Sequence, residues 1–302
     1  MAQYIESRME AFMRTRFLQK MTSYEVEAYL GRNDIIFVPL GVVENHSDFP
    51  MDVETVTPTA FAKVMADQVD GLILGELNYL FCGANCVSRG TVKMTIETGY
   101  RYVKEICYSL INQGFRRIIM ISFHGPAYLT GGAVARDIFD ETKVPVAYVD
   151  LMNVLKEAGA NGYKMPEGSS INDFFYGGYA ILNKKDELLI DPNGEQEGPG
   201  NSGLEQSEEM AFFSYAQKLA SQSMGFYFAK PQDHGGRIGS CISTEERDNR
   251  CARGEKMIRD VIANVDMPRF VKEQRELDIW TNTVIKERYG NHLPKNKFSE
   301  WK

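Results

Sequence analysis

Short runs of β-branched and apolar residues alternate with longer segments of helical periodicity along most of this chain. The clearest apolar runs cover residues 34–43 and 117–122, and a shorter run covers 72–74. Continuous apolar runs are typical of strands that are buried on both faces. Because strand and helix alternate, the pattern predicts an α/β fold with a mostly parallel central sheet and helices on both faces.

Capping residues indicate where several helices begin and end. Thr22 carries a hydroxyl that can cap a helix, and Pro58 is suited to the first turn of a helix that runs to about Val69. A long helix over 96–113 ends at Gly114, where glycine allows a left-handed cap. The pattern predicts further helices at 131–141, 152–158, 204–221 and 244–264, and strands at 144–149 and 226–229.

No Pro/Gly/Ser-rich linker divides the apolar segments. We therefore expect one α/β domain over residues 1–265, which begins with an N-terminal helical segment at 1–32. Residues 266–302 are expected to form a C-terminal helical tail that packs on a neighbouring surface or subunit. Residues 159–203 are rich in Gly, Asn, Asp and Pro, which predicts a long excursion over the site.

Composition favours an enzyme that acts on a small molecule. The formal net charge of -7 and the pI near 5.3 disfavour nucleic-acid binding, which needs a basic face. No apolar run approaches the roughly 20 residues that span a bilayer, so no membrane association is expected. The first residues do not resemble a signal peptide, and the five cysteines are odd in number, so a reduced, cytoplasmic setting is expected.

Two of the four histidines lie just past the ends of the two strongest apolar runs. The carboxyl ends of parallel strands open onto a crevice, where functional groups collect. His46 follows the first run, and His124 follows the second. The carboxylates close to the first histidine are Glu44, Asp48, Asp52 and Glu54. Imidazole nitrogens beside clustered carboxylates predict a divalent-cation site.

Cys82 and Cys86 are an alternative origin for a metal site. Their spacing lacks a second cysteine pair or a nearby histidine. We therefore interpret both as free thiols, because free cysteine mostly behaves as a small apolar residue.

Several spaced motifs together resemble the creatininase (creatinine amidohydrolase) family. The run from Pro39 to His46 fits its first signature, Pro-x-Gly-x-x-Glu-x-His, and the following loop is one residue shorter than in the family, so that Glu54 replaces an aspartate. The middle signature is matched in order by Gly90-Thr91, Glu97-Thr98, Ser109-Leu110, Gly114-Phe115 and the strand that ends at His124-Gly125. A late Glu-Thr-Ser signature is matched by Glu205-Gln206-Ser207. The resemblance spans about residues 33–264.

The resemblance implies two divalent cations per subunit, with Zn or Mn as the expected metals. Carried over by position, Glu44, Glu54 and His124 would hold one cation, while His46, Glu54 and Glu205 would hold the other. The family also implies a symmetric homo-oligomer, with six subunits expected. A cation pair can activate a water molecule and polarise a carbonyl group in one pocket, so the implied activity is hydrolysis.

Each assignment has an alternative. Glu44 and His46 alternate in direction if the strand persists, so one of them could face solvent while the other packs. Asp52 competes with Glu54, whereas Glu208 and Glu209 compete with Glu205 as residues of an exposed helical face. His124 has the alternative of a satisfied core histidine. We assign His124, Glu54 and His234 to catalysis, the last as a substrate-facing residue of the Gly-rich turn 234–239, where the alternative is a simple turn histidine. His292 is expected at the surface.

The expected substrate is inferred from positions at which this chain differs from the family pattern. Members that act on creatinine carry a proton-transferring histidine before the late glutamate, whereas this chain has Asn201 in that stretch. Pro126 and Ala127 also alter the usual turn after His124. We therefore expect a cyclic polyol ketone such as 3-dehydro-scyllo-inosose, opened by C–C hydrolysis. Alternatives are an amidohydrolase for a cyclic amide or formamide, a sugar or polyol isomerase, and a metal-binding protein without catalysis.

Overall fold

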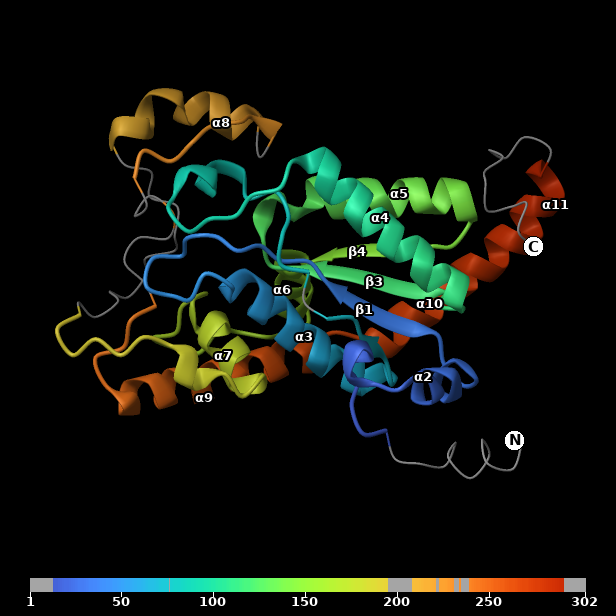
Figure 1. Ribbon diagram of the computed structural model, residues 1–302, viewed down its shortest axis with the longest axis horizontal. Helices are drawn as coiled ribbons and strands as arrows, with labels where there is room; N and C mark the ends of the chain where they lie inside the picture. The colour runs from blue at the N-terminus through green and yellow to red at the C-terminus, as the bar shows by residue number, and fades with distance from the viewer. Residues whose placement is uncertain are drawn as a thin grey trace.

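Four parallel strands form the central sheet in the order β2-β1-β3-β4 (Figure 1). The computed structural model describes residues 13–75, 77–194, 208–220, 223–230, 234 and 239–290. The strands are β1 (Ile35–Pro39), β2 (Leu72–Ile73), β3 (Arg117–Ser122) and β4 (Ala147–Asp150). This arrangement confirms the predicted α/β class with a parallel sheet.

Alternate residues of each strand enter two separate apolar cores. Ile35 and Phe37 of β1 belong to one core, whereas Ile36 and Val38 belong to the other. Successive side chains of a strand point to opposite faces, so a strand that is apolar throughout must be covered on both sides.

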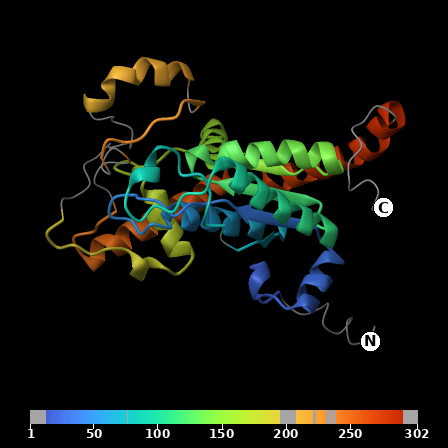
Figure 2. The ribbon, with the colours of Figure 1, turned by 45° about the horizontal axis from the view of Figure 1, so that its top comes forward.

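Helices cover both faces, and Figure 1 shows α4 and α5 on the opposite side of the sheet from α3, α7 and α9. The first core is covered by α3 (Val53–Val69), α6 (Leu151–Ala160), α7 (Asp173–Ile181), α9 (Thr244–Ala263) and α10 (Met267–Trp280). The second core is covered by α2 (Ser23–Leu30), α4 (Ile96–Gln113) and α5 (Tyr128–Thr142). The remaining elements are η1 (Leu18–Lys20), η2 (Gly83–Val87), η3 (Gly125–Ala127), η4 (Lys185–Glu187), η5 (Glu208–Phe213), α8 (Ser214–Ala220), the π-helix η8 (Thr281–Ile285) and α11 (Lys286–Tyr289). In two views, α8 stands apart from the two helical layers (Figures 1 and 2).

Two predicted helix ends are confirmed by their hydrogen bonds. The Thr22 hydroxyl accepts from the Glu25 N–H at 3.3 Å, and the Glu25 carboxylate accepts from the Thr22 N–H at 2.7 Å. This reciprocal capping box satisfies two N–H groups that a helix start leaves free. At the other end of α4, Gly114 has φ 110°, the left-handed conformation that glycine adopts at low cost.

Three local predictions are wrong. Helix α3 begins at Val53, so Pro58 lies inside the helix and leaves the Glu54 carbonyl without its usual N–H donor. Residues 226–229 form no strand; instead, the Phe228 N–H donates to the Ala84 carbonyl at 3.3 Å. Within the predicted excursion 159–203, residues Asp173–Ile181 form the buried helix α7. Eight of its nine residues are apolar, aromatic or glycine, which fits an inner layer better than a lid.

The predicted C-terminal tail contributes to the core of its own chain. Met267 and Val271 of α10 join the first core. The buried Gln274 amide donates to the carbonyls of Ile118 at 3.3 Å and Pro145 at 2.6 Å. The predicted boundary at residue 265 stays a prediction, but α10 packs against the sheet layer. No helix within the described part of the chain is long and apolar enough to cross a membrane.

Parallel register brings the exits of β1 and β3 to the same end of the sheet. Pro39 pairs with Ile121, and the Leu40 N–H donates to the Ile121 carbonyl at 2.8 Å. The Ser122 hydroxyl donates to the Leu40 carbonyl at 2.7 Å and accepts from the His124 N–H at 3.1 Å. The segments that carry the two predicted histidines therefore leave the sheet side by side.

Candidate metal centre

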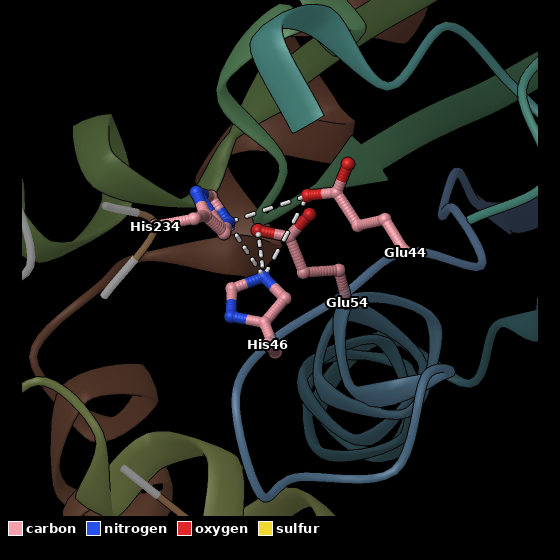
Figure 3. A group of neighbouring side chains, drawn as sticks. All are labelled: Glu44, His46, Glu54 and His234. Carbon is pink, nitrogen blue, oxygen red and sulfur yellow. Dashed lines mark hydrogen bonds and ion pairs between the residues drawn. The ribbon is translucent and has the colours of Figure 1, made fainter. Parts of the chain in front are cut away.

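Five titratable side chains from separate segments converge at the carboxyl end of the sheet. Glu44 and His46 follow β1, His124 follows β3, and Glu54 is the second residue of α3. His234 comes from a turn more than 100 residues later in the chain. Figure 3 shows Glu44, His46, Glu54 and His234 pointing toward one another.

Close packing places the start of α3 against the exit of β1. A Cβ on Gly41 would lie 2.2 Å from the Thr55 hydroxyl oxygen, so only glycine fits there. The Thr55 hydroxyl donates to the Val42 carbonyl at 3.2 Å. These two contacts bring Glu54 next to Glu44 although ten residues separate them in sequence.

The imidazole of His46 lies at the middle of one group of donor atoms. Its Nε2 is 3.2 Å from Glu54 Oε1 and 3.7 Å from Glu44 Oε1. His234 Nε2 is 3.2 Å from His46 Nε2 and 3.4 Å from Glu44 Oε1. The four ligand atoms all lie within 4.8 Å of one another, the spacing of a group that can hold one cation.

His124 lies on the other side of Glu54. Its Nδ1 contacts Glu54 Oε2 and is 3.5 Å from Glu44 Oε1, while its Nε2 is 2.9 Å from the Phe81 carbonyl. A carbonyl only accepts, so Nε2 carries the proton and Nδ1 faces the carboxylates. Glu54 thus directs one oxygen toward His46 and the other toward His124, which is the arrangement of a bridging carboxylate.

Glu44 shows that these residues suit a cation. Its side chain is completely buried, and both carboxylate oxygens lack a hydrogen-bond partner among the described residues. His46 Nδ1 is also buried without a partner in that part of the chain. A buried carboxylate without a donor is strongly destabilising unless a positive charge compensates it.

The two carboxyl groups have opposite pKa shifts. Burial, together with the negative charge of Glu54, raises the pKa of Glu44 well above its ordinary value of 4.5. Burial also opposes ionisation of Glu54, but attraction to His124 and His46 outweighs it and holds the Glu54 pKa well below 4.5. These opposite shifts favour the negative charge of the pair on Glu54 rather than on Glu44.

The histidines respond to the same two effects. Burial disfavours the charged form of His124, but the Glu54 carboxylate outweighs burial and raises the His124 pKa. Burial and the neighbouring His46 lower the pKa of His234 to about 4. His234 is therefore neutral at physiological pH and offers a lone pair.

Aromatic rings pack beside two of the imidazoles. Phe175 of α7 makes an edge contact with His46, with ring centroids 5.4 Å apart. Phe228 lies 5.3 Å from His234 by the same measure. Such apolar neighbours lower the local dielectric and strengthen electrostatic interactions in the site.

Cys82 and Cys86 are free thiols, as predicted, and neither belongs to the group of possible metal ligands in the described chain. Burial raises the pKa of Cys82 to about 12, so its sulfur stays protonated. A thiol in this state is a poor metal ligand.

The structure places most of the predicted site residues in one cluster. Glu44, His46, Glu54 and His124 meet as expected. Asp52 does not compete with Glu54, because its carboxylate accepts from the Tyr179 hydroxyl at 2.7 Å. Glu205 lies outside the described residues, as does His292.

His234 was predicted to face substrate, yet its Nε2 lies among the possible ligand atoms. Sequence reasoning missed this placement and also the Phe81 carbonyl. The rarity of histidine and the Gly-rich turn that follows position 234 were the available signals for His234.

Comparisons with known proteins find a family profile, a relative and solved structures that resemble this chain. The sequence profile of the creatininase family, described as creatinine amidohydrolase, matches residues 19–175. A creatinine amidohydrolase from Pseudomonas putida is 27% identical over 115 residues, which cover 36% of this chain and 44% of the relative. The match thus spans less than half the length of that curated relative.

Solved structures resemble the fold over most of the chain. A putative creatinine amidohydrolase from Bacteroides fragilis NCTC 9343 superposes with a TM-score of 0.56 at 14% identity, covering 89% of this chain and 98% of its own. A structure described as creatininase Mn gives 0.52 at 16% identity, covering 82% and 98%. At these identities the likeness establishes the shared fold.

Proposed function

This chain belongs to the creatininase family, and we propose that it is a divalent-metal-dependent hydrolase that opens a small polar cyclic substrate at a carbonyl carbon. One observation carries the proposal: the donor atoms of His46, Glu54, His124 and His234 surround the buried carboxylate of Glu44, which has no other hydrogen-bond partner among the described residues. Solved relatives described as a manganese form and a Zn–Zn form support two divalent cations as the cofactor.

We assign the cation ligands from the contacts of Glu54. Its Oε2 contacts His124, and Glu44 lies beside both, so these three residues would hold one cation. Its Oε1 faces His46, which would hold the second cation, with Glu205 as the further ligand proposed from sequence. When bound, such a cation pair lowers the pKa of water and polarises a carbonyl oxygen.

The protein side chains prepare the site for this chemistry. Glu54 is ionised and bridges both halves of the cluster, so it relieves repulsion between two positive charges. The Phe81 carbonyl fixes the ring orientation of His124. Phe175 excludes water from the side of His46, which keeps the local dielectric low.

A polyhydroxylated cyclic ketone, of the kind of 3-dehydro-scyllo-inosose, is our preferred substrate class. Asn201 stands in the stretch where creatinine-hydrolysing members carry a proton-transferring histidine, and Pro126 changes the turn beside His124. A ketone ring with hydroxyl groups offers both an electrophilic carbonyl and cation-binding oxygens. A cyclic amide is the second candidate, favoured by the name of the Pseudomonas putida relative.

Metal analysis of the native protein, followed by mass spectrometry on a panel of inosose-type ketones and cyclic amides, tests the proposal. Hydrolysis adds the mass of one water to the substrate, whereas isomerisation adds nothing. His124→Ala is expected to abolish turnover while the circular dichroism spectrum stays native. A metal-replete His124→Ala protein with full activity would overturn the proposal.

We also propose a homo-oligomer. Exposed apolar side chains at the end of α10, Leu277, Ile279 and Trp280, offer a surface for a second copy. Light scattering on the purified protein gives the subunit number, for which six is expected from the family resemblance.

A further inference from the structure

We propose that His234 is a direct ligand of the cation held by His46 and Glu54. This inference rests on the metal centre of the proposed function and adds a ligand to it. It assigns a protein ligand to the late turn of this chain and makes this half of the centre rich in imidazole.

The spacing of the donor atoms supports direct ligation. Ligand atoms that lie about 2.0–2.2 Å from one tetrahedral ion are about 3.3–3.6 Å from each other. His46 Nε2 lies 3.2 Å from Glu54 Oε1 and 3.2 Å from His234 Nε2, which is close to this spacing. The three donor atoms are therefore placed to share one cation.

The contact between the two imidazoles argues against a separate role for His234. Its Nε2 is 3.2 Å from His46 Nε2, so in the absence of a cation one ring has to donate a proton to the other. A cation between them allows both nitrogens to act as lone-pair donors. A proton-transferring histidine would instead direct this nitrogen toward a substrate atom.

Contacts on the protein side hold the His234 ring in this orientation. Its ring packs on Phe228, whose N–H donates to the Ala84 carbonyl of η2. The loop from Gly83 to Val87 is thereby tied to the same segment. The His234 side chain is only 24% exposed, so its ring has less freedom to rotate than the ring of a histidine in an exposed turn.

The donor set predicts the class of cation. The imidazole nitrogens of His46 and His234 beside a carboxylate oxygen of Glu54 suit Zn²⁺, whereas Mg²⁺ and Ca²⁺ prefer oxygen ligands alone. Loss of one imidazole should weaken binding of Zn²⁺ more than that of Mn²⁺, because Mn²⁺ lies lower in the order of affinity for nitrogen ligands.

Zinc titration of the metal-free protein tests the assignment without any substrate. We expect His234→Ala to weaken the affinity for one Zn²⁺ by at least about 100-fold, with a smaller loss for Mn²⁺, because loss of even a supporting residue costs 10- to 100-fold. X-ray absorption at the zinc edge should show fewer imidazole ligands in His234→Ala. Tyr227→Phe, at an exposed position nearby, is the matched control and should bind zinc as the wild type does.

Two further variants separate the possible failures. If His234→Ala keeps wild-type zinc affinity and imidazole count while Glu205→Gln loses a zinc, the late ligand is Glu205 and the inference is wrong. If Glu54→Gln also binds two zinc ions normally, the metal centre of the proposed function fails as well. Native circular dichroism of each variant ensures that the loss is not caused by unfolding.

Discussion

Gly177 of α7 and Gly254 of α9 face each other at a helix crossing that leaves no room for a side chain. A Cβ on Gly177 would lie 2.3 Å from the carbonyl carbon of Gly254, and a Cβ on Gly254 would lie 1.9 Å from the Asp173 carbonyl oxygen. The same helix α7 carries Phe175 against His46. The crossing therefore sets how closely Phe175 approaches His46 of the candidate metal centre.

Gly254→Ala is expected to destabilise the protein by about 3 kcal/mol or more, because overpacking against backbone forces the helices apart. Chemical denaturation measures the change in the free energy of unfolding. Gly132→Ala is the control, since no atom of the described residues lies within 4 Å of a Cβ at that helical position. It should be neutral or stabilising by up to about 1 kcal/mol. Equal effects of the two substitutions would contradict this account of the crossing.

Glu44→Gln should stabilise the metal-free protein at alkaline pH while it removes metal binding. The folded-state pKa of Glu44 is raised, so its ionisation destabilises the fold as the pH rises through that pKa. The amide has no charge to bury, and a gain of about 1–3 kcal/mol is expected. Thermal melts of both proteins with a chelator, from pH 5 to pH 9, measure the difference. If the wild type were as stable as the variant at pH 9, ionisation of Glu44 would not destabilise the fold and this account would be wrong.

Glu54→Asp is expected to lose at least about 100-fold in zinc affinity even though the charge is kept. Removal of one methylene withdraws the carboxylate by about 1.5 Å, so it cannot reach both His46 and His124. Glu54→Gln keeps the length but not the charge and should also lose binding. Calorimetric zinc titration of both variants shows whether binding requires the length of the Glu54 side chain, its charge or both. Full binding by the aspartate variant would exclude a bridging role.

Zinc affinity should rise with pH, because Glu44 must lose its proton before it can bind a cation. Glu44 keeps this proton at pH values above its ordinary pKa of 4.5, whereas His234, with a pKa of about 4, is already neutral there. The affinity is expected to increase about tenfold per pH unit for each proton displaced. Calorimetry in buffers of different ionisation enthalpy counts the released protons. A pH-independent affinity between pH 5 and pH 7 would count against Glu44 as a ligand.

Gln274→Leu is expected to destabilise the fold by about 1–3 kcal/mol, since it removes the buried amide that donates to the carbonyls of Ile118 and Pro145. Lys272→Leu on the exposed face of the same helix is the control and should change the stability by less than about 0.5 kcal/mol. Urea denaturation of both variants measures the contribution of α10. No difference between them would indicate that α10 is dispensable for the domain.

The sequence predicted the elements whose signals are local. The bounds of α4 follow from helical periodicity and Gly114, and those of β3 from an uninterrupted apolar run. Pro58 was misleading because tertiary packing of α3 overrides the preference of proline for a first turn. Helix α7 was missed since it is apolar on all sides and contains two glycines, which weakens any helical period.

The residues of the candidate site likewise divide into those that the local sequence predicts and those that depend on tertiary structure. Glu44, His46 and His124 could be predicted because each lies within a few residues of a strand end, and strand ends have a fixed place in a parallel sheet. Nothing in the local sequence around His234 reveals which atoms it will meet, because its position depends on a chain path of more than 100 residues after β3. The contact of His124 with the Phe81 carbonyl could not be predicted from the sequence, since every residue has a backbone carbonyl.

Strands β1 and β3 end at the same edge of the sheet, which limits the insertions and deletions that the segment after β1 tolerates. A deletion between Pro39 and Glu44 would pull the carboxylate along by roughly 3.3 Å per residue, far beyond the few tenths of an ångström that a coordination bond tolerates. The solvent-exposed stretch from 164 to 168 has no such partner in the cluster and can change length more freely. Insertions and deletions in relatives should therefore concentrate outside the segment from Pro39 to Glu44, and substrate preference can change without moving the possible cation ligands.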